Sequence, residues 1–306
     1  MRSRCRLRSR NTVTTKAFGR SSARLFPASR ERAPSDGSKT WAEPGHPPRR
    51  RRNQTPLSFR AVRLGLISDI HGNLLALDAV LGELNEAGID RLVCLGDVAA
   101  GPEPRETIER LREVACPVVL GNWDTWVLDG VPPLALQAGP MLRDQGEWSG
   151  AQLSEPDKDF LRRLQPRLEL ELDGATVLCV HGSPRSALED IHATTSDEDI
   201  AQMFNGTKPT VLAAGHTHVQ LARVHGTTLI VNPGSVGLPF NSWPPNGAIR
   251  MSPWAEYAIL TVEDGRVSTE LRRAPYDIPA LLDIAQASGM PHRDWWGEQW
   301  LKAAQT

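Results

Sequence analysis

The chain has 306 residues, of which 40% are hydrophobic, and its formal net charge is −1. That length allows one large domain or two small ones, and the apolar share is enough for a sizeable core. The apolar runs are all shorter than a membrane span and none resembles the apolar core of a secretory signal, so we expect neither feature.

The charge is divided unevenly along the chain. Residues 1–56 hold 15 Lys and Arg against three acids, a net of +12, whereas residues 57–306 hold 20 against 33, a net of −13. The basic segment lacks hydrophobic periodicity and cannot offset its ordering entropy by burial, so we predict a disordered extension. An organelle transit peptide, a nucleic-acid-binding arm and a nuclear signal all fit its composition, as do a dispensable tail and an upstream start codon chosen in error.

Residues 62–122 predict alternating strands and helices. The short apolar runs typical of buried strands are 62–68, 91–96 and 117–122. Residues 74–87 carry apolar side chains at helical spacing before Gly88, and residues 104–114 form a second amphipathic segment that begins at Pro104. This alternation indicates a parallel α/β sheet.

The second half of the chain is rich in strand-like segments. Residues 129–155 are punctuated by Pro and Gly and predict a helical insertion near a substrate cleft. The predicted strands that follow are 168–172, 176–182, 210–215, 219–224, 228–232, 256–263 and 266–272. Asp264-Gly265 is a hairpin signal between the last two. We expect one domain over residues 57–275 and a helical, Trp-rich extension over residues 276–306, including a helix at 279–288, that packs on it.

The four cysteines form no CxxC pair. Cys94 and Cys179 stand in apolar, strand-like runs, so we interpret both as small buried hydrophobic residues in a reducing compartment. This interpretation predicts a cytoplasmic protein.

Polar side chains recur where the predicted strands end. The candidate donors are two carboxylates, four imidazoles and one amide: Asp69, His71, Asp97, Asn122, His181, His216 and His218. In open parallel sheets the loops beyond the carboxyl ends of the strands converge on the ligand site, so we expect these residues to meet. Asp69 and His71 are alternate residues of an extended segment and can face one metal, with Gly72 permitting a sharp turn behind them.

The donor mixture suits borderline divalent ions such as Mn, Fe, Zn or Ni, of which we favour Mn. Seven donors are too many for one tetrahedral ion, but they suffice for two ions about 3.5–4 Å apart if one carboxylate bridges, an arrangement used for displacement at phosphorus. Two dications, two carboxylates and a bridging hydroxide leave a net charge of about +1, which would attract a phosphate ester. Alone, the Asp-x-His would indicate a capped turn and the His-x-His a surface pair; their joint spacing favours metal binding.

Six short motifs stand in order: SDIHGN (68–73), GD (96–97), GNWD (121–124), VHGSP (180–184), GHTH (215–218) and NPGSVG (232–237). Over roughly residues 62–272 this order resembles the calcineurin-like metallophosphoesterase superfamily. The short linkers and the closing NPGSVG are most similar to its small bacterial and archaeal phosphodiesterase branch. The resemblance implies an α/β fold, a four-layer αββα sandwich of two mixed β-sheets flanked by helices.

The resemblance also implies a role for each donor. Asp69, His71 and His218 would bind the first metal, and Asp97 would bridge the two metals. The second metal would be bound by Asn122, His181 and His216. The nucleophile would be a metal-bridging hydroxide that attacks phosphorus opposite the leaving oxygen. Ser235 in NPGSVG would be structural, in a loop that supports GHTH.

One residue departs from the family pattern. Many members read GNHD, where the His is thought to protonate the leaving alkoxide or steady the transition state, and this chain has Trp123 instead. Indole is not an acid at neutral pH, so we expect slower chemistry that favours good leaving groups, unless Trp123 is simply a packing residue beside Trp126. Asp124 would orient water or hold Asn122, and Asn73 and Trp123 are candidates for substrate contact.

The sequence therefore predicts a dinuclear, metal-dependent phosphoesterase that hydrolyses phosphodiesters or activated phosphate esters. The candidate catalytic residues are Asp97, Asn122 and Asp124. Hydrolysis of dinucleoside polyphosphates, dephosphorylation of phosphoproteins, and a non-enzymatic binding scaffold of the same fold remain alternatives. We expect a small phosphate ester as the partner, with nucleic acid disfavoured because the folded part is acidic, no membrane partner, and homo-oligomerisation left open.

Overall fold

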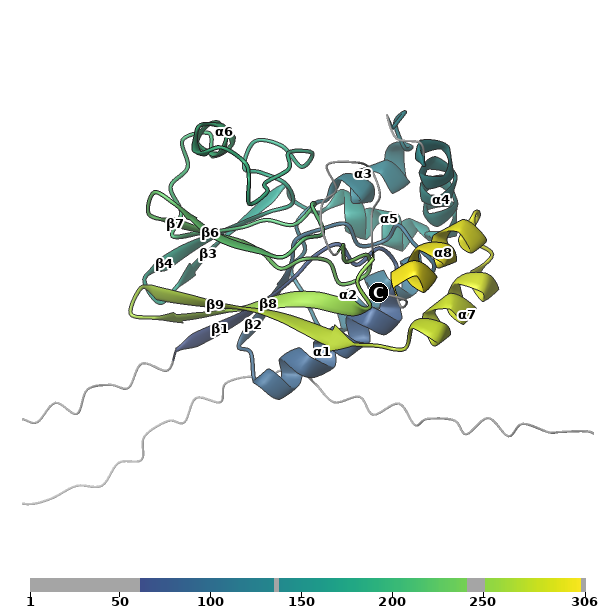
Figure 1. Cartoon of the computed structure of the whole chain (residues 1–306), viewed down its shortest axis with the longest axis horizontal. Coiled ribbons are helices and arrows are strands. Elements are labelled where there is room, and N and C mark those ends of the chain that lie inside the picture. Colours follow the sequence, from purple (N-terminus) through teal and green to yellow (C-terminus); the bar gives the residue numbers. More distant parts are fainter. Residues whose placement is uncertain (1–60, 135–137, 241–250, 304–306) are drawn as a thin grey trace, which may run out of the picture. The chain divides into compact units, whose positions relative to one another are not determined.

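The computed structural model describes residues 61–134, 138–240 and 251–303 of the chain (Figure 1). The predicted disordered extension over residues 1–56 lies outside these residues, and its division from the folded part stays a prediction. Within the described part, no helix is both long enough and apolar enough to cross a bilayer.

The first sheet has the strand order β2-β1-β8-β9. Its strands are β1 (Val62–Ile67), β2 (Arg91–Cys94), β8 (Trp254–Glu263) and β9 (Arg266–Pro275). β1 pairs in parallel with β2 and antiparallel with β8, so the sheet is mixed. The hairpin predicted at Asp264-Gly265 is confirmed, because Glu263 and Arg266 pair across it.

The second sheet has the order β3-β4-β5-β7-β6. Its strands are β3 (Arg167–Leu172), β4 (Ala175–Val180), β5 (Val211–Ala213), β6 (Leu221–His225) and β7 (Thr228–Asn232). The central strands β4, β5 and β7 are parallel, whereas β3 and β6 pair antiparallel at the two edges. The parallel centre brings the carboxyl ends of β4 and β5 to the same edge of the sheet.

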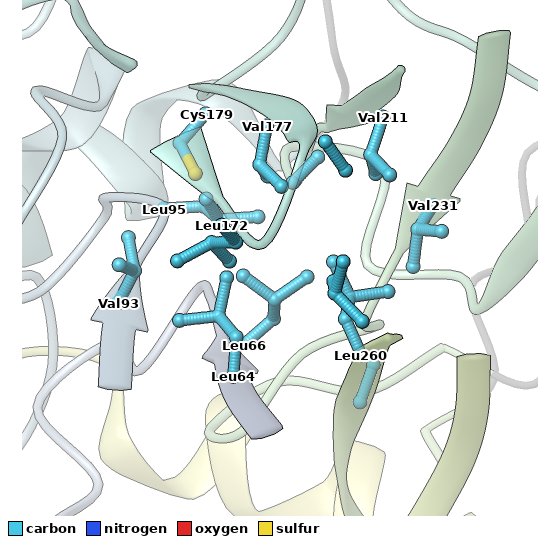
Figure 2. Packing of buried hydrophobic residues seen from close by; sticks show 14 of the residues in the cluster. Leu64, Leu66, Val93, Leu95, Leu172, Val177, Cys179, Val211, Val231 and Leu260 are labelled. Atoms are coloured by element: carbon cyan, nitrogen blue, oxygen red, sulfur yellow. The ribbon is translucent and has the colours of Figure 1, made fainter. Parts of the chain in front are cut away.

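The two sheets pack face to face across an apolar core. Leu64 and Leu66 of β1 point toward Val177 and Cys179 of β4, and all four side chains are buried (Figure 2). The intervening Leu178 faces the other way, because successive side chains of a strand alternate between its two faces. Because both faces of β4 are buried, its sequence is a nearly continuous apolar run.

Helices cover the outer faces of both sheets (Figure 1). They are α1 (Leu74–Ala87), α2 (Pro104–Glu113), α3 (Asn122–Asp129), α4 (Gly139–Gln152), α5 (Glu155–Arg162), α6 (Asp197–Met203), α7 (Ile278–Ser288) and α8 (Arg293–Ala303). α1 packs on β8 and β9, while Ile200 of α6 packs on Leu178 of β4. The predicted four-layer αββα sandwich is therefore confirmed.

The signals that bound helix α1 in the sequence operate in the structure. The Asn73 side chain accepts a hydrogen bond from the Ala76 N–H at 3.1 Å and caps the N-terminus. Gly88 ends the helix in the left-handed conformation, with φ of 66°. Leu77, Val80 and their neighbours on the same face are buried, as the apolar spacing predicts.

The strand predicted over residues 117–122 is wrong. Val118 and Val119 form only isolated bridges, to Cys94 and Gln165. The reason is local: Gly121 is the N-cap of α3, and its N–H donates to the Asp124 carboxylate at 2.9 Å. Helix capping at this point ends the extended segment before a full strand can form.

The helix of the insertion predicted over residues 129–155 is α4, and the helix predicted at 279–288 is α7. α7 and α8 (yellow in Figure 1) are held by a second apolar cluster in which Trp296 and Trp300 are buried. Trp148 of α4, Leu238 and Phe240 pack against this cluster. The C-terminal helices thus contact the segment that follows the GHTH motif.

Candidate metal centre

All seven predicted donors lie just beyond strand ends or at the start of α3. Asp69 and His71 follow β1, Asp97 follows β2, and Asn122 is the first residue of α3. The remaining three, His181, His216 and His218, follow β4 and β5. Backbone hydrogen bonds tie these loops together, from the Asp69 N–H to the Gly96 carbonyl at 2.9 Å and from the His71 N–H to the Asp97 carbonyl at 3.0 Å.

The backbone is unusual at five of these donors. The residues with positive φ are Asp69 (54°), His71 (49°), Asp97 (57°), His216 (68°) and His218 (58°). Non-glycine residues adopt this left-handed conformation infrequently, and each instance costs on the order of 1–3 kcal/mol. The strain persists because the loop hydrogen bonds over-determine the backbone, and such strain clusters at functional sites.

Two glycines allow the loops to approach this closely. Gly72 has φ of 61°, and a Cβ there would meet the backbone of Gly101 at 2.8 Å. A Cβ on Gly215 would collide with the Ser68 hydroxyl and come within 2.9 Å of the Asp69 carboxylate. The turn predicted behind His71 therefore uses both the positive φ and the missing side chain.

The first group of donors comprises Asp69, His71, Asp97 and His218, all buried. The His218 Nε2 atom lies 3.3 Å from Asp69 Oδ1 and 3.2 Å from His71 Nε2. His71 Nε2 is also 3.8 Å from Asp97 Oδ2. Four potential ligand atoms thus face one small volume.

The second group comprises Asp97, His181 and His216. His181 Nε2 lies 3.3 Å from Asp97 Oδ2 and 2.9 Å from the Asn122 Oδ1 atom. Asp97 is the member that the two groups share, which is the position a bridging ligand must occupy.

Two of the imidazoles are oriented by backbone carbonyls. The Nδ1 atom of His181 donates to the Leu95 carbonyl, and that of His218 donates to the Leu238 carbonyl, both at 2.7 Å. With Nδ1 as the donor to a carbonyl, Nε2 is the nitrogen that faces the centre, as is typical of metal-ligating histidines.

One oxygen of each of the two carboxylates has no hydrogen-bond donor among the described residues. Asp69 Oδ1 and Asp97 Oδ2 are fully buried, yet neither accepts a hydrogen bond. Burying an anionic oxygen without a hydrogen bond costs free energy, and a bound cation would compensate that cost. Together with the imidazoles, these oxygens form a donor set that fits a borderline divalent ion.

The pKa values of Asp69 and His181 are shifted in the directions that favour a positive charge beside the carboxylates. Burial raises the pKa of Asp69, but the neighbouring His218, His181 and His71 hold it well below its usual range. Burial lowers the pKa of His181, but the Asp97 and Asp69 carboxylates raise it to about 10. In the metal-free protein His181 therefore carries a proton at neutral pH, and a metal ion must displace it.

Comparison with known proteins adds a second line of support. The model of the calcineurin-like phosphoesterase superfamily domain matches residues 62–265, which is more than half of the chain. The chain belongs to the calcineurin-like phosphoesterase superfamily. The family predicted from the motifs is thus confirmed, and phosphoesters are the substrate class that this family implies.

Several relatives are small archaeal and bacterial proteins. Protein MJ0912 of Methanocaldococcus jannaschii, itself named as uncharacterized, is 27% identical over 256 residues, which cover 77% of this chain and 96% of the relative. Phosphodiesterase YfcE of Escherichia coli K12 is 29% identical over 191 residues, 58% of this chain and 81% of that protein. These relatives agree with the predicted branch of the superfamily.

Solved structures share the fold. A metallophosphoesterase from Sphaerobacter thermophilus has a TM-score of 0.60 at 28% identity and covers 80% of this chain and 99% of its own. Protein PH1004 from Pyrococcus horikoshii has a TM-score of 0.63 at 22% identity, covering 76% and 95%, and supports the fold alone.

The Asp124 carboxylate accepts hydrogen bonds from backbone N–H groups. The donors are the N–H groups of Asp97 at 2.9 Å, Val98 at 2.8 Å and Gly121 at 2.9 Å. Burial and the nearby Asp97 raise the pKa of Asp124 to about 6. These contacts hold the loops that carry Asp97 and Asn122 together, and a catalytic role for Asp124 stays a prediction.

The two residues predicted to contact substrate differ in exposure. Asn73 is fully buried, where it caps α1 and its side-chain amide donates to the Gly237 carbonyl at 3.3 Å. Trp123 is half-buried, its backbone N–H donates to Asp97 Oδ1 at 2.8 Å, and its ring meets the edge of His71 with centroids 6.1 Å apart. Trp123 also packs edge-on against Trp126. Substrate contact by either residue stays a prediction.

The NPGSVG loop is hydrogen-bonded to the backbone of Asp69 and to the GHTH segment. The Ser235 hydroxyl donates to the Asp69 carbonyl at 2.6 Å. The Asn232 side-chain amide donates to the Gly215 carbonyl at 2.7 Å and to the Thr217 hydroxyl at 3.0 Å. These bonds agree with a structural role for Ser235 and with a loop that supports GHTH.

The sequence analysis missed one acidic neighbour of the donors. Asp190 Oδ1 lies 3.4 Å from His216 Nε2. Asp190 stands in an irregular loop after the VHGSP motif, away from any strand end, so neither periodicity nor strand-exit position marks it in the sequence.

Proposed function

We propose that this protein is a metal-dependent phosphodiesterase whose active centre holds two divalent cations. The observation that carries the proposal is the convergence of seven donors from separate loops, with Asp97 common to both groups. Two buried carboxylate oxygens without hydrogen bonds supply the negative charge that cations would neutralise.

The residues divide naturally between two ions. Asp69, His71 and His218 would hold one cation; Asn122, His181 and His216 would hold the other, with Asp97 between them. Such cations would supply Lewis-acid stabilisation of the phosphate oxygens and lower the pKa of water at the site. The imidazole and carboxylate donors favour Mn, Fe, Zn or Ni, with Mn preferred.

The charge of the centre supports an anionic substrate. Asp69 and Asp97 contribute two negative charges, and two divalent cations would contribute four positive charges. The excess lies in a buried environment, where electrostatic attraction for a phosphate ester is stronger than in water.

Trp123 bears on which esters would react. Trp123 stands where many family members have the His of the GNHD motif. Its indole N–H does not dissociate at neutral pH, so Trp123 is not a general acid. Substrates whose leaving group departs without protonation, such as aryl phosphate esters and phosphoanhydrides, are therefore favoured. The name of the E. coli relative, a phosphodiesterase, supports diesters as the class.

The test compares two substrates with the same leaving group. The full chain is stripped with EDTA and loaded with Mn²⁺, and hydrolysis of bis(4-nitrophenyl) phosphate and of 4-nitrophenyl phosphate is followed by nitrophenolate absorbance. We expect faster hydrolysis of the diester and loss of activity in Asp97→Asn. Absence of hydrolysis with Mn, Fe, Zn and Ni alike, or full activity in Asp97→Asn, would overturn the proposal.

A further inference from the structure

The loop between β4 and α6 brings a carboxylate against one of the candidate ligands. Asp190 Oδ1 lies 3.4 Å from His216 Nε2, and the other oxygen, Oδ2, lies 3.7 Å from His192 Nε2. The His216 side chain is 18% exposed and that of Asp190 is 38% exposed, so the pair stands at the solvent side of the centre.

The residues before Asp190 hold this loop in place. The carboxylate of Glu189 accepts from the Ser183 hydroxyl at 2.5 Å and from the Arg185 Nε at 2.9 Å. The Ser183 hydroxyl oxygen in turn accepts the N–H groups of Arg185 and Ser186, each at 3.1 Å. A closed hydrogen-bond network thus fixes the position immediately before Asp190.

The residues after Asp190 are held independently. Ile191 is buried in the apolar cluster that contains Leu178 and Val180 of β4. The Arg223 guanidinium donates to the carbonyls of His192 at 3.3 Å and Thr195 at 2.7 Å. Asp190 therefore lies between two anchored neighbours, and its backbone has little freedom to turn the carboxylate away from His216.

The environment of His216 differs from that of two other ligand histidines. His181 and His218 each donate Nδ1–H to a backbone carbonyl, whereas His216 faces a carboxylate with Nε2. A carboxylate next to an imidazole favours the tautomer that has its proton on the facing nitrogen, and it raises the basicity of the ring. Because the carboxylate faces Nε2, we infer that Nδ1 is the nitrogen that would bind a metal.

We propose that Asp190 is a positioning residue that orients His216 and strengthens its donation to the second cation. The inference rests on the proposed function, because it requires a cation at the group formed by Asp97, His181 and His216. Asp190 acts through the imidazole and does not touch the reacting atoms.

Cation titration tests the inference without relying on activity. The metal-free full chain and its Asp190→Ala variant are titrated with Co²⁺ by calorimetry and by the visible absorption of bound Co²⁺. We expect two binding events, of which Asp190→Ala weakens one by about 10–100-fold, the usual effect of losing such a partner, while the other stays within about twofold. Asp190→Glu should restore part of the loss.

The control is Glu198→Gln, which removes an exposed charge on the neighbouring helix α6. It should leave both events unchanged, and the melting temperature of metal-free Asp190→Ala should equal that of the unaltered chain. At saturating Mn²⁺ the kcat of Asp190→Ala should recover, with the half-activating concentration raised by about 10–100-fold.

Three outcomes would overturn the inference. Equal affinities in Asp190→Ala and the unaltered chain would reduce the pair to a surface contact, with the proposed function intact. Equal weakening of both events would point to a general effect on the fold. Failure of the unaltered chain to bind any cation would overturn this inference and the proposed function together.

Discussion

Replacement of Asp97 by Asn should change how the stability of the metal-free protein depends on pH. Asp97 Oδ2 lies 3.3 Å from His181 Nε2, and both side chains are buried. Burial lowers the pKa of His181, but Asp97, followed by Asp69, raises it from the ordinary 6.5 to about 10. Each tenfold change in proton affinity corresponds to about 1.4 kcal/mol, so the proton on His181 stabilises the folded state by on the order of 5 kcal/mol.

The sign follows from linkage between proton binding and folding. Because the folded pKa of His181 lies above the unfolded value, this contribution is complete below about pH 6.5 and is lost as the pH rises toward about 10. The surrounding histidines lower the pKa of Asp97 although burial opposes them, so its carboxylate stays ionised throughout this window. The Asn substitution removes that negative charge, so the pKa of His181 should fall.

Urea denaturation of EDTA-treated protein at pH 6, 7.5 and 9 measures the effect. Asp97→Asn should be less stable than the unaltered chain at pH 6, and the gap should narrow at pH 9 by on the order of 2–4 kcal/mol. Asp283→Asn, at an exposed position of α7, is the matched control and should show no such trend. A gap that stays constant or widens with pH would refute the ion-pair reasoning.

Two further substitutions test other parts of the structure. In the Mn²⁺-loaded protein, Trp123→His should raise kcat for diesters with alkyl leaving groups by about 10²-fold and raise kcat for aryl esters less, because an imidazole can protonate the departing oxygen. Trp123→Phe is the control. If Trp123→His gives no gain in kcat on any ester, the argument that a general acid is missing is wrong. Burial raises the pKa of Glu256 to about 7 although Arg273 opposes it, so Glu256→Gln should add on the order of 3 kcal/mol to the free energy of unfolding at pH 8 and little below pH 4.5. Urea midpoints at both pH values measure this, with Glu270→Gln on the adjacent strand as control, and a less stable Gln variant at pH 8 would contradict it.

Local features of the fold could be predicted from the sequence. Helix α1 was marked by its apolar spacing, by Asn73 and by Gly88, all of which act within a few residues of one another. The segment 117–122 was not predicted correctly, because its apolar residues suit a strand while the capping contact of Asp124 starts a helix. Two local preferences competed there, and the tertiary contacts of Asp124 with Asp97 and Val98 favoured the helix.

The identity of the candidate donors was also readable from the sequence, since Asp and His residues at strand ends form a pattern that a known family shares. The proximity of Asp190 to His216 could not be predicted, because the two residues lie in different loops and no sequence periodicity links them. The order of the motifs therefore identified the family, and the side-chain chemistry identified the class of ligand.

By itself, the sequence determined which donor atoms are available and which strands and helices carry them, because side-chain chemistry and local backbone preference are properties of short segments. Only the tertiary structure decided that two carboxylate oxygens are left without hydrogen bonds and that the pKa of His181 is raised to about 10. These properties depend on distance and burial, which arise when remote loops are brought together and water is removed from between them.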